Sequence, residues 1–146
     1  MKKTTILASH NITNEINLGF NPNDYSKFKF GSSNIGNRFG IDLFEKLINT
    51  NNKYLKSYNK IYVFTSPYDY IPTATNTIFE TFFKSLSDHL INDVLVEKRK
   101  IHRNTTYTND YGGLSKDQRM KLISNDSFDL DNNFSGDELL IFIDDI

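Results

Sequence analysis

Two adjacent carboxylates, Asp144 and Asp145, follow directly on the apolar run 139–143. Five apolar residues without polar alternation are typical of a strand buried on both faces, which would place Phe142 in the core. Adjacent carboxylates repel each other, so such a pair is stable beside hydroxyl donors or a divalent cation. The pair therefore either binds a ligand that supplies these groups or only ends the strand.

The second candidate for chemistry is a loop that follows residues 60–65, the first convincing core strand. The loop begins with Ser66, Pro67 and Tyr68, and Pro72 has a fixed φ that suits the first turn of a helix. A helix that begins there points free backbone N–H groups back at the loop, which makes an anion site possible. The alternative is an ordinary connection between a strand and a helix.

The elements that must position these two candidates can be predicted from hydrophobic periodicity. Apolar residues recur at helical spacing in some segments and form short unbroken runs in others. They predict helices at 34–48 and 72–90 and strands at 60–65, 94–101 and 138–143. This order predicts a three-layer α/β fold with a mostly parallel sheet. Since ligands bind at the carboxyl ends of such strands, we expect Ser66 and Asp144 to face one pocket.

The segments outside this pattern are interpreted as coverings of the core. Residues 1–32 show no regular period, and we expect an irregular hood or lid over a partial core formed by residues 33–146. A long polar loop spans about 104–113, and Ser115 with Gln118 matches the capping box of a short helix. No internal repeat or linker is visible, so we expect the whole chain to form a single domain.

The composition excludes several classes of function. The chain has 146 residues and a net charge of −1, so no global field attracts nucleic acid or acidic membranes. It has no cysteine, which excludes disulfides, thiolate zinc sites and cysteine nucleophiles. No apolar run is long enough to span a membrane, and the apolar stretch behind Met1 is too short for a signal peptide. We therefore expect a cytoplasmic protein that binds neither nucleic acid nor a membrane.

The apolar strand with its acidic pair resembles the first half of the phosphoribosyl-diphosphate (PRPP) signature of type I phosphoribosyltransferases. Further segments, in the same order, resemble one bacterial subgroup, the phosphoribosyltransferase-like proteins of tellurite-resistance and stress gene clusters. Those segments are residues 28–32, 66–68, 71–74, 100–103, 110–115 and 118–119. The resemblance covers about residues 18–146.

This resemblance implies a site for PRPP and Mg²⁺ and transfer of its phosphoribosyl group to a nitrogenous base. Asp144 and Asp145 would hold the ribose hydroxyls, with Mg²⁺ bridging ligand oxygens near them rather than sitting in a protein cage. The loop of Ser66, Pro67 and Tyr68 would bind the pyrophosphate. No residue for general base catalysis can be assigned.

The resemblance also implies a mobile loop over the site, at about residues 100–113. Lys100, His102 and Arg103 are the cations best placed to meet the charge of the pyrophosphate. The alternative for them is a solvated strand end. Tyr107 and Tyr111 would stack on a base or simply pack this lid against the core.

In the family, a loop rich in Gly and Thr follows the acidic pair and wraps the 5′-phosphate. That loop is not among these 146 residues, so we expect an incomplete core. Two functions remain open. The chain is a phosphoribosyltransferase, or it is a non-catalytic nucleotide-binding, ribose-phosphate-binding or regulatory module. In either case a homo-oligomer or another chain could complete the sheet.

Overall fold

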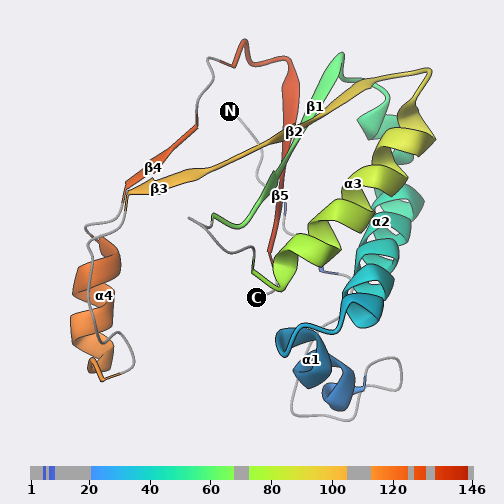
Figure 1. The fold of residues 1–146 in the computed structure, drawn as a ribbon. Coiled ribbons are helices and arrows are strands. Elements are labelled where there is room, and N and C mark those ends of the chain that lie inside the picture. Colours follow the sequence, from blue (N-terminus) through green and yellow to red (C-terminus); the bar gives the residue numbers. More distant parts are fainter. Residues whose placement is uncertain are drawn as a thin grey trace.

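The computed structural model describes residues 5, 7–8, 21–67, 73–104, 113–124, 127–130 and 134–144. Its elements in chain order are α1 (Pro22–Lys29), α2 (Ser33–Leu55), β1 (Lys60–Thr65), α3 (Thr75–Leu90), β2 (Leu95–Arg99), β3 (His102–Asn104), α4 (Lys116–Ser124), β4 (Ser127–Asp129) and β5 (Glu138–Ile143). Figure 1 shows a body of sheet and helices, and an arm that carries α4.

Strands β2, β1 and β5 form one parallel sheet, with β1 in the middle. Lys60, at the start of β1, is aligned with Leu95 of β2 and Glu138 of β5, and Thr65 at its end is aligned with Ile143. Strands β1 and β5 therefore end together, at the lower edge of the sheet in Figure 1. This confirms the predicted parallel α/β arrangement, although β2 is shorter than predicted.

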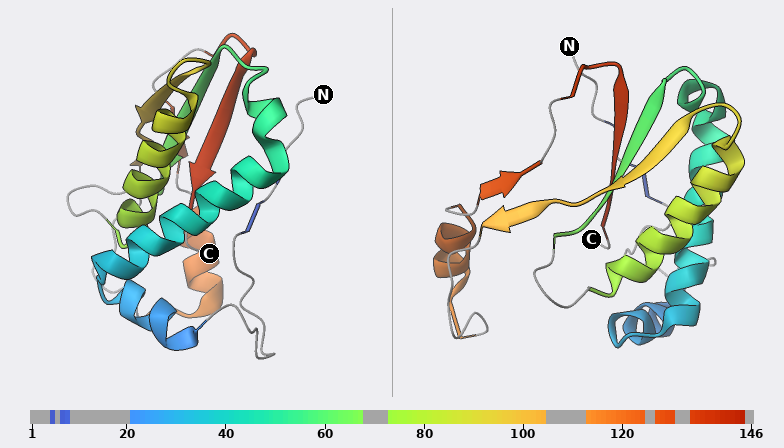
Figure 2. Two further views of the ribbon diagram at one scale, coloured as in Figure 1. Left: turned by 90° about the vertical axis from the view of Figure 1, so that its right-hand side faces the viewer. Right: turned by 45° about the horizontal axis from the view of Figure 1, so that its top comes forward.

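Helices α2 and α3 lie side by side on one face of the sheet (Figure 2). The apolar side chains of α3 pack against the strands, and those of α2 complete the same cluster. The buried residues of this core include Phe39, Leu55, Ile61, Val63, Phe79, Phe82, Leu86, Leu90 and Ile143. Two of the three predicted layers are thus formed by the residues that the structure describes.

The opposite face of the sheet is aromatic. Tyr62 and Phe64 of β1 contact Phe134, at ring-centroid distances of 5.5 and 6.3 Å. Phe142 of β5 stacks on Phe64 at 4.8 Å but is 54% exposed. The prediction that β5 is buried on both faces, with Phe142 in the core, is therefore wrong. A run of apolar residues does not reveal which face of a strand is covered by other elements. In β5 the helices cover the face that carries Ile143, and this residue is only 3% exposed.

Helix α1 lies in the segment that we expected to be irregular. Asn21 caps it by accepting a hydrogen bond from the backbone N–H of Asn23 at 2.9 Å, and Pro22 stands in its first turn. Arg38 of α2 holds the helix through a 2.6 Å ion pair with Asp24. The signal for α1, Asn followed by Pro, was present in the sequence but is equally typical of a turn.

Helix α2 is longer than predicted, because it continues past residue 48 to Leu55. The asparagines near residue 50 favoured an end there, since Asn has a weak preference for helices. Leu55 is completely buried, so tertiary packing outweighs that local preference. Despite its 23 residues α2 is not apolar enough to cross a membrane, and the same holds for every other helix that the structure describes.

Helix α2 approaches α3 most closely at two glycines. A Cβ added to Gly40 would lie 2.7 Å from the backbone oxygen of Ile78, and one added to Gly36 would lie 2.8 Å from Cβ of Thr77. Any side chain at these positions would push the helices apart. Gly36 lies near the start of α2, so its contact holds the turn between α1 and α2 against the N-terminal end of α3.

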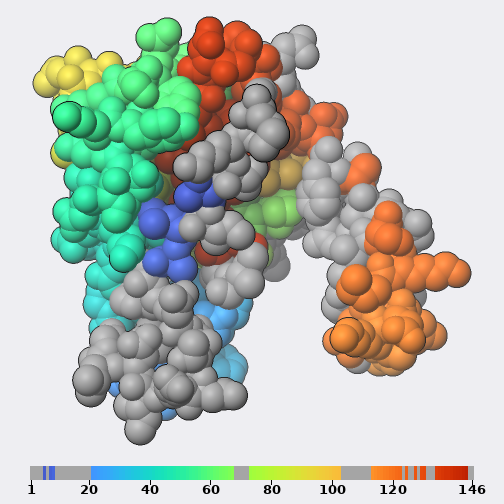
Figure 3. All heavy atoms as spheres, turned by 180° about the vertical axis from the view of Figure 1, so that it is seen from behind, coloured from blue at the N-terminus to red at the C-terminus, as the bar shows by residue number. Residues whose placement is uncertain are grey.

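Strands β3 and β4 pair antiparallel at the base of an arm that carries α4 away from the body (Figure 3). Helix α4 begins with the predicted capping box. The backbone N–H of Gln118 donates to Oγ of Ser115 at 3.3 Å, and the backbone N–H of Ser115 donates to Oε1 of Gln118 at 2.8 Å. The capping-box pattern therefore predicted the start of α4 correctly. The pairing of β3 with β4, which have three residues each, had no signal in the sequence.

Candidate functional site

The structure brings Ser66 and Asp144 together at the carboxyl edge of the sheet. Ser66 follows β1 and Asp144 follows β5, and the register of these neighbouring strands aligns their last residues. The Ser66 hydroxyl donates a hydrogen bond to Oδ1 of Asp144 at 2.7 Å and lies 3.4 Å from the backbone oxygen of Ile143. The predicted juxtaposition is confirmed, while the role of each residue remains a prediction.

A pocket of about 440 Å³ opens at this pair, and we call it the Ser66–Asp144 pocket. It is lined by Lys29, Ser66, Thr73, Ala74, Thr75 and Asp144. The N-terminal end of α3 forms one wall, and aligned peptide dipoles give such an end a partial positive charge. Ala74 occupies the N-cap position, so no side chain caps this end. The pocket therefore combines a carboxylate with a helix end that favours anions.

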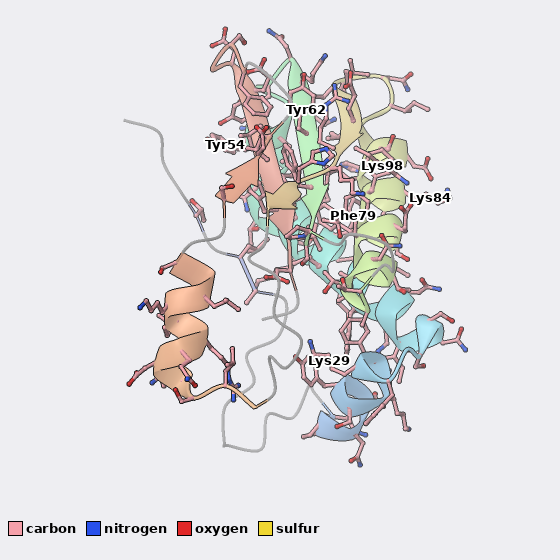
Figure 4. All side chains as sticks on the ribbon, turned by 60° about the vertical axis from the view of Figure 1, so that its left-hand side comes forward. Lys29, Tyr54, Tyr62, Phe79, Lys84 and Lys98 are labelled. Carbon is pink, nitrogen blue, oxygen red and sulfur yellow. The ribbon has the colours of Figure 1, made fainter. Side chains whose placement is uncertain are left out.

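Lys29, the last residue of α1, adds a cation to the pocket that we did not predict. Its ammonium nitrogen also lies 5.6 Å from the centroid of the Tyr25 ring, one turn earlier in α1. Figure 4 shows Lys29 at the end of α1, on the side of the molecule where the strands end. The sequence marked residues 28–32 only as part of a resemblance. The place of Lys29 follows from α1, which sequence reasoning missed.

Two of the predicted cations, Lys100 and His102, lie where the chain passes from one sheet to the next. Lys100 follows β2 and His102 begins β3, where the chain leaves the sheet, and neither is among the described residues that line the pocket. Lys98, earlier in the same basic run, pairs with Glu80 of α3. Figure 4 shows Lys98 near Phe79, whose ring centroid lies 5.7 Å from its ammonium nitrogen. Part of the basic run therefore fastens β2 to α3.

Several predicted site residues lie outside the part of the chain that the structure describes. They are Tyr68, Tyr107, Tyr111 and Asp145, together with the side chain of Arg103. Pro67 is described and follows Ser66, but it is not among the lining residues of the pocket. The roles assigned to these residues remain predictions.

A Mg²⁺ ion at this site would have to be held mainly by a ligand. Within the described ranges, no group of three or more His, Cys, Asp or Glu residues could hold a metal ion. Mg²⁺ usually keeps several waters and is bound by one or two carboxylates together with substrate phosphates. Asp144 is a carboxylate of this kind, so the pocket fits a cation that arrives with a phosphorylated ligand.

Comparison with known families gives a match over nearly the whole chain. The model of the family described as PRTase (phosphoribosyltransferase) ComF-like matches residues 2–146. No curated protein and no solved structure was found to match the chain. The matched residues include every element that forms the Ser66–Asp144 pocket.

Proposed function

Because the chain belongs to the ComF-like phosphoribosyltransferase family, we propose that the Ser66–Asp144 pocket binds a phosphorylated ribose, with PRPP as the first candidate. One observation carries this proposal: a carboxylate, a hydroxyl, a helix N-terminus and a lysine line the same pocket of about 440 Å³. Ribose hydroxyls donate hydrogen bonds to a carboxylate, and phosphates are attracted by a helix N-terminus and by an ammonium group.

Each wall of the pocket has a separate task in this proposal. Asp144 accepts hydrogen bonds from the ribose hydroxyls, and the neighbouring Asp145 is the second acceptor. Lys29 and the N-terminal end of α3 offset the charge of a phosphate group. Ser66 holds the Asp144 carboxylate in position through the 2.7 Å hydrogen bond. A hydrogen bond to a charged group contributes about 1.5–3 kcal/mol, so the loss of one is measurable.

Mg²⁺ bound with PRPP would supply positive charge between the ligand phosphates and the carboxylate. Asp144 is the residue of this pocket that would contact such an ion or its water shell. We therefore expect PRPP to bind more tightly with MgCl₂ than without it.

The family reaction that fits this pocket is transfer of a phosphoribosyl group to a nitrogen nucleophile. The bond between ribose C1 and a pyrophosphate oxygen breaks, and pyrophosphate leaves with the electron pair. The nitrogen forms a bond to C1 and loses a proton. The protein contributes positioning and electrostatic stabilisation.

A second candidate function is binding of the same ligand without transfer. Asp144 is the only acidic side chain among the described residues that line the pocket, and it already accepts a hydrogen bond from Ser66. A base that would take the proton from the nucleophile is therefore not part of this lining. Release of pyrophosphate from PRPP on addition of a base distinguishes the two functions, because a binding module releases none.

Isothermal calorimetry with PRPP, with and without MgCl₂, tests the proposed binding. We expect Asp144→Asn to weaken binding about tenfold or more, because the substitution removes the charge from an accepting group. Asp88→Asn is the matched control, since Asp88 lies in the last turns of α3 and pairs with Lys84 at 2.6 Å on the surface. Equal affinities of Asp144→Asn and wild type would contradict the proposal.

A further inference from the structure

Two tyrosines lie ring to ring where α2 passes into β1. Tyr54 is in the last turn of α2, and Tyr58 lies in the connection that leads to Lys60, the first residue of β1. Their ring centroids are 5.1 Å apart, and the ring planes are nearly perpendicular, at 87°. The Tyr58 hydroxyl donates a hydrogen bond to the Tyr54 hydroxyl. The two phenol groups are therefore in direct contact.

The backbone around the two tyrosines holds them in this arrangement. The backbone N–H of Ser57 donates to the backbone oxygen of Tyr54 at 3.1 Å, and that of Tyr58 donates to the backbone oxygen of Leu55 at 3.3 Å. Leu55 is completely buried, and Tyr58 packs against the same core. Tyr54, in contrast, is 51% exposed. One phenol is thus open to solvent, while the turn fixes the other beside it.

The composition of the chain directs one-electron oxidation to tyrosine. The chain has eight tyrosines and lacks cysteine and tryptophan, the other side chains that lose a single electron readily. Its two methionines react differently, because they take up an oxygen atom and become sulfoxides. The hydrogen bond to Tyr54 raises the pKa of Tyr58 to about 12, so Tyr58 is an uncharged phenol at neutral pH. A phenol that has lost an electron releases its proton, and the exposed Tyr54 passes protons to water.

We propose that Tyr54 and Tyr58 form an oxidative cross-linking site, at which a one-electron oxidant joins the two rings as dityrosine. Each phenol gives one electron to the oxidant and one proton to water. The two tyrosyl radicals then form a carbon–carbon bond between ring carbons ortho to the hydroxyls. The hydrogen atoms on these carbons move to the oxygens, which restores both phenols. Two equivalents of oxidant are therefore reduced, and the protein loses two hydrogen atoms.

The contact between the rings favours this bond over bonds between different molecules. Groups that are held together in one molecule react faster than the same groups on separate molecules. The product joins the last turn of α2 covalently to the connection before β1. The inference does not rest on the proposed function, because the two tyrosines precede the start of β1 whereas the Ser66–Asp144 pocket lies where β1 ends.

Oxidation of the full chain by a photogenerated ruthenium(III) complex, followed by trypsin digestion and mass spectrometry, tests the inference. Trypsin cleaves after lysine, so Tyr54 and Tyr58 fall on the separate peptides 54–56 and 57–60. We expect the two peptides to be recovered as one species that has lost two hydrogen atoms. The monomeric protein should show the blue fluorescence of dityrosine, and the yield per molecule should not change when the protein is diluted.

Three variants and one change of solvent provide the controls. Tyr54→Phe and Tyr58→Phe keep both rings but remove one phenol, so each should abolish the joined peptides. Tyr62→Phe should leave their yield unchanged, since the Tyr62 ring contacts Phe134 at 5.5 Å. In urea the contact between the rings is lost although their spacing in the sequence is not, and we expect the yield to fall. No joined peptides from wild type, their persistence in Tyr54→Phe or Tyr58→Phe, or an equal yield in urea would each overturn the inference.

Discussion

Replacing Gly40 by alanine tests the close contact between α2 and α3. The added Cβ would lie 2.7 Å from the backbone oxygen of Ile78, 2.8 Å from Cβ of Thr81 and 3.2 Å from the backbone nitrogen of Phe82. None of these atoms is the end of a flexible side chain, so α2 and α3 must move apart. Overpacking of this kind costs about 1–3 kcal/mol. Alanine in place of glycine inside a helix gains about 1 kcal/mol.

We expect the cost of overpacking at Gly40 to lie in the upper part of that range, because the nearest atom belongs to the backbone of α3. The expected net loss in the free energy of unfolding is about 1–2 kcal/mol, measured by urea denaturation. Glu45, exposed in the middle of α2, provides the control. The difference between Glu45→Ala and Glu45→Gly gives the helix preference alone, about 1 kcal/mol in favour of alanine. Stabilisation of the protein by Gly40→Ala to that same extent would refute the close approach of the helices.

Two further predictions concern β5. Ile143→Ala should lower the free energy of unfolding by about 2–5 kcal/mol, and Phe142→Ala by only about 1–2 kcal/mol, because Ile143 is buried and Phe142 is half exposed. The reverse order in urea denaturation would contradict the assignment of the two faces. The Ser135 hydroxyl, followed by backbone N–H groups, lowers the pKa of Glu138 from its ordinary 4.5 to about 2. The stabilisation that this carboxylate gives to its turn is thus complete above pH 4.5 and is lost as the pH falls through about 2. An NMR titration should find the low pKa in wild type and a higher one in Ser135→Ala; equal values would count against the hydrogen bond.

The sheet and its central pair of side chains could be predicted because they depend on patterns within short segments. Unbroken apolar runs gave the strands, and the rule that parallel strands end at one edge placed Ser66 next to Asp144. The capping box at Ser115 is equally local. The burial of Phe142 was mispredicted, because covering of a strand face depends on which elements pack on it.

Lys29 could not be placed from the sequence, because its position depends on tertiary contacts. Gly36 lets α2 pack closely on α3, and Arg38 pairs with Asp24 of α1, so both contacts help to hold α1 and Lys29 near the N-terminal end of α3. The site roles of Lys100 and His102 stay predictions. The chain leaves the sheet between β2 and β3, and neither residue is among the described residues that line the pocket.

The most direct test of the Ser66–Asp144 pocket is NMR mapping of backbone amide shifts while PRPP and MgCl₂ are added to the full chain. We predict that the largest changes occur at Ser66, Thr75 and Asp144, the three points where β1, α3 and β5 meet the pocket. Changes centred on Tyr62 and Phe142, on the aromatic face of the sheet, would contradict a ribose-phosphate site at the carboxyl edge.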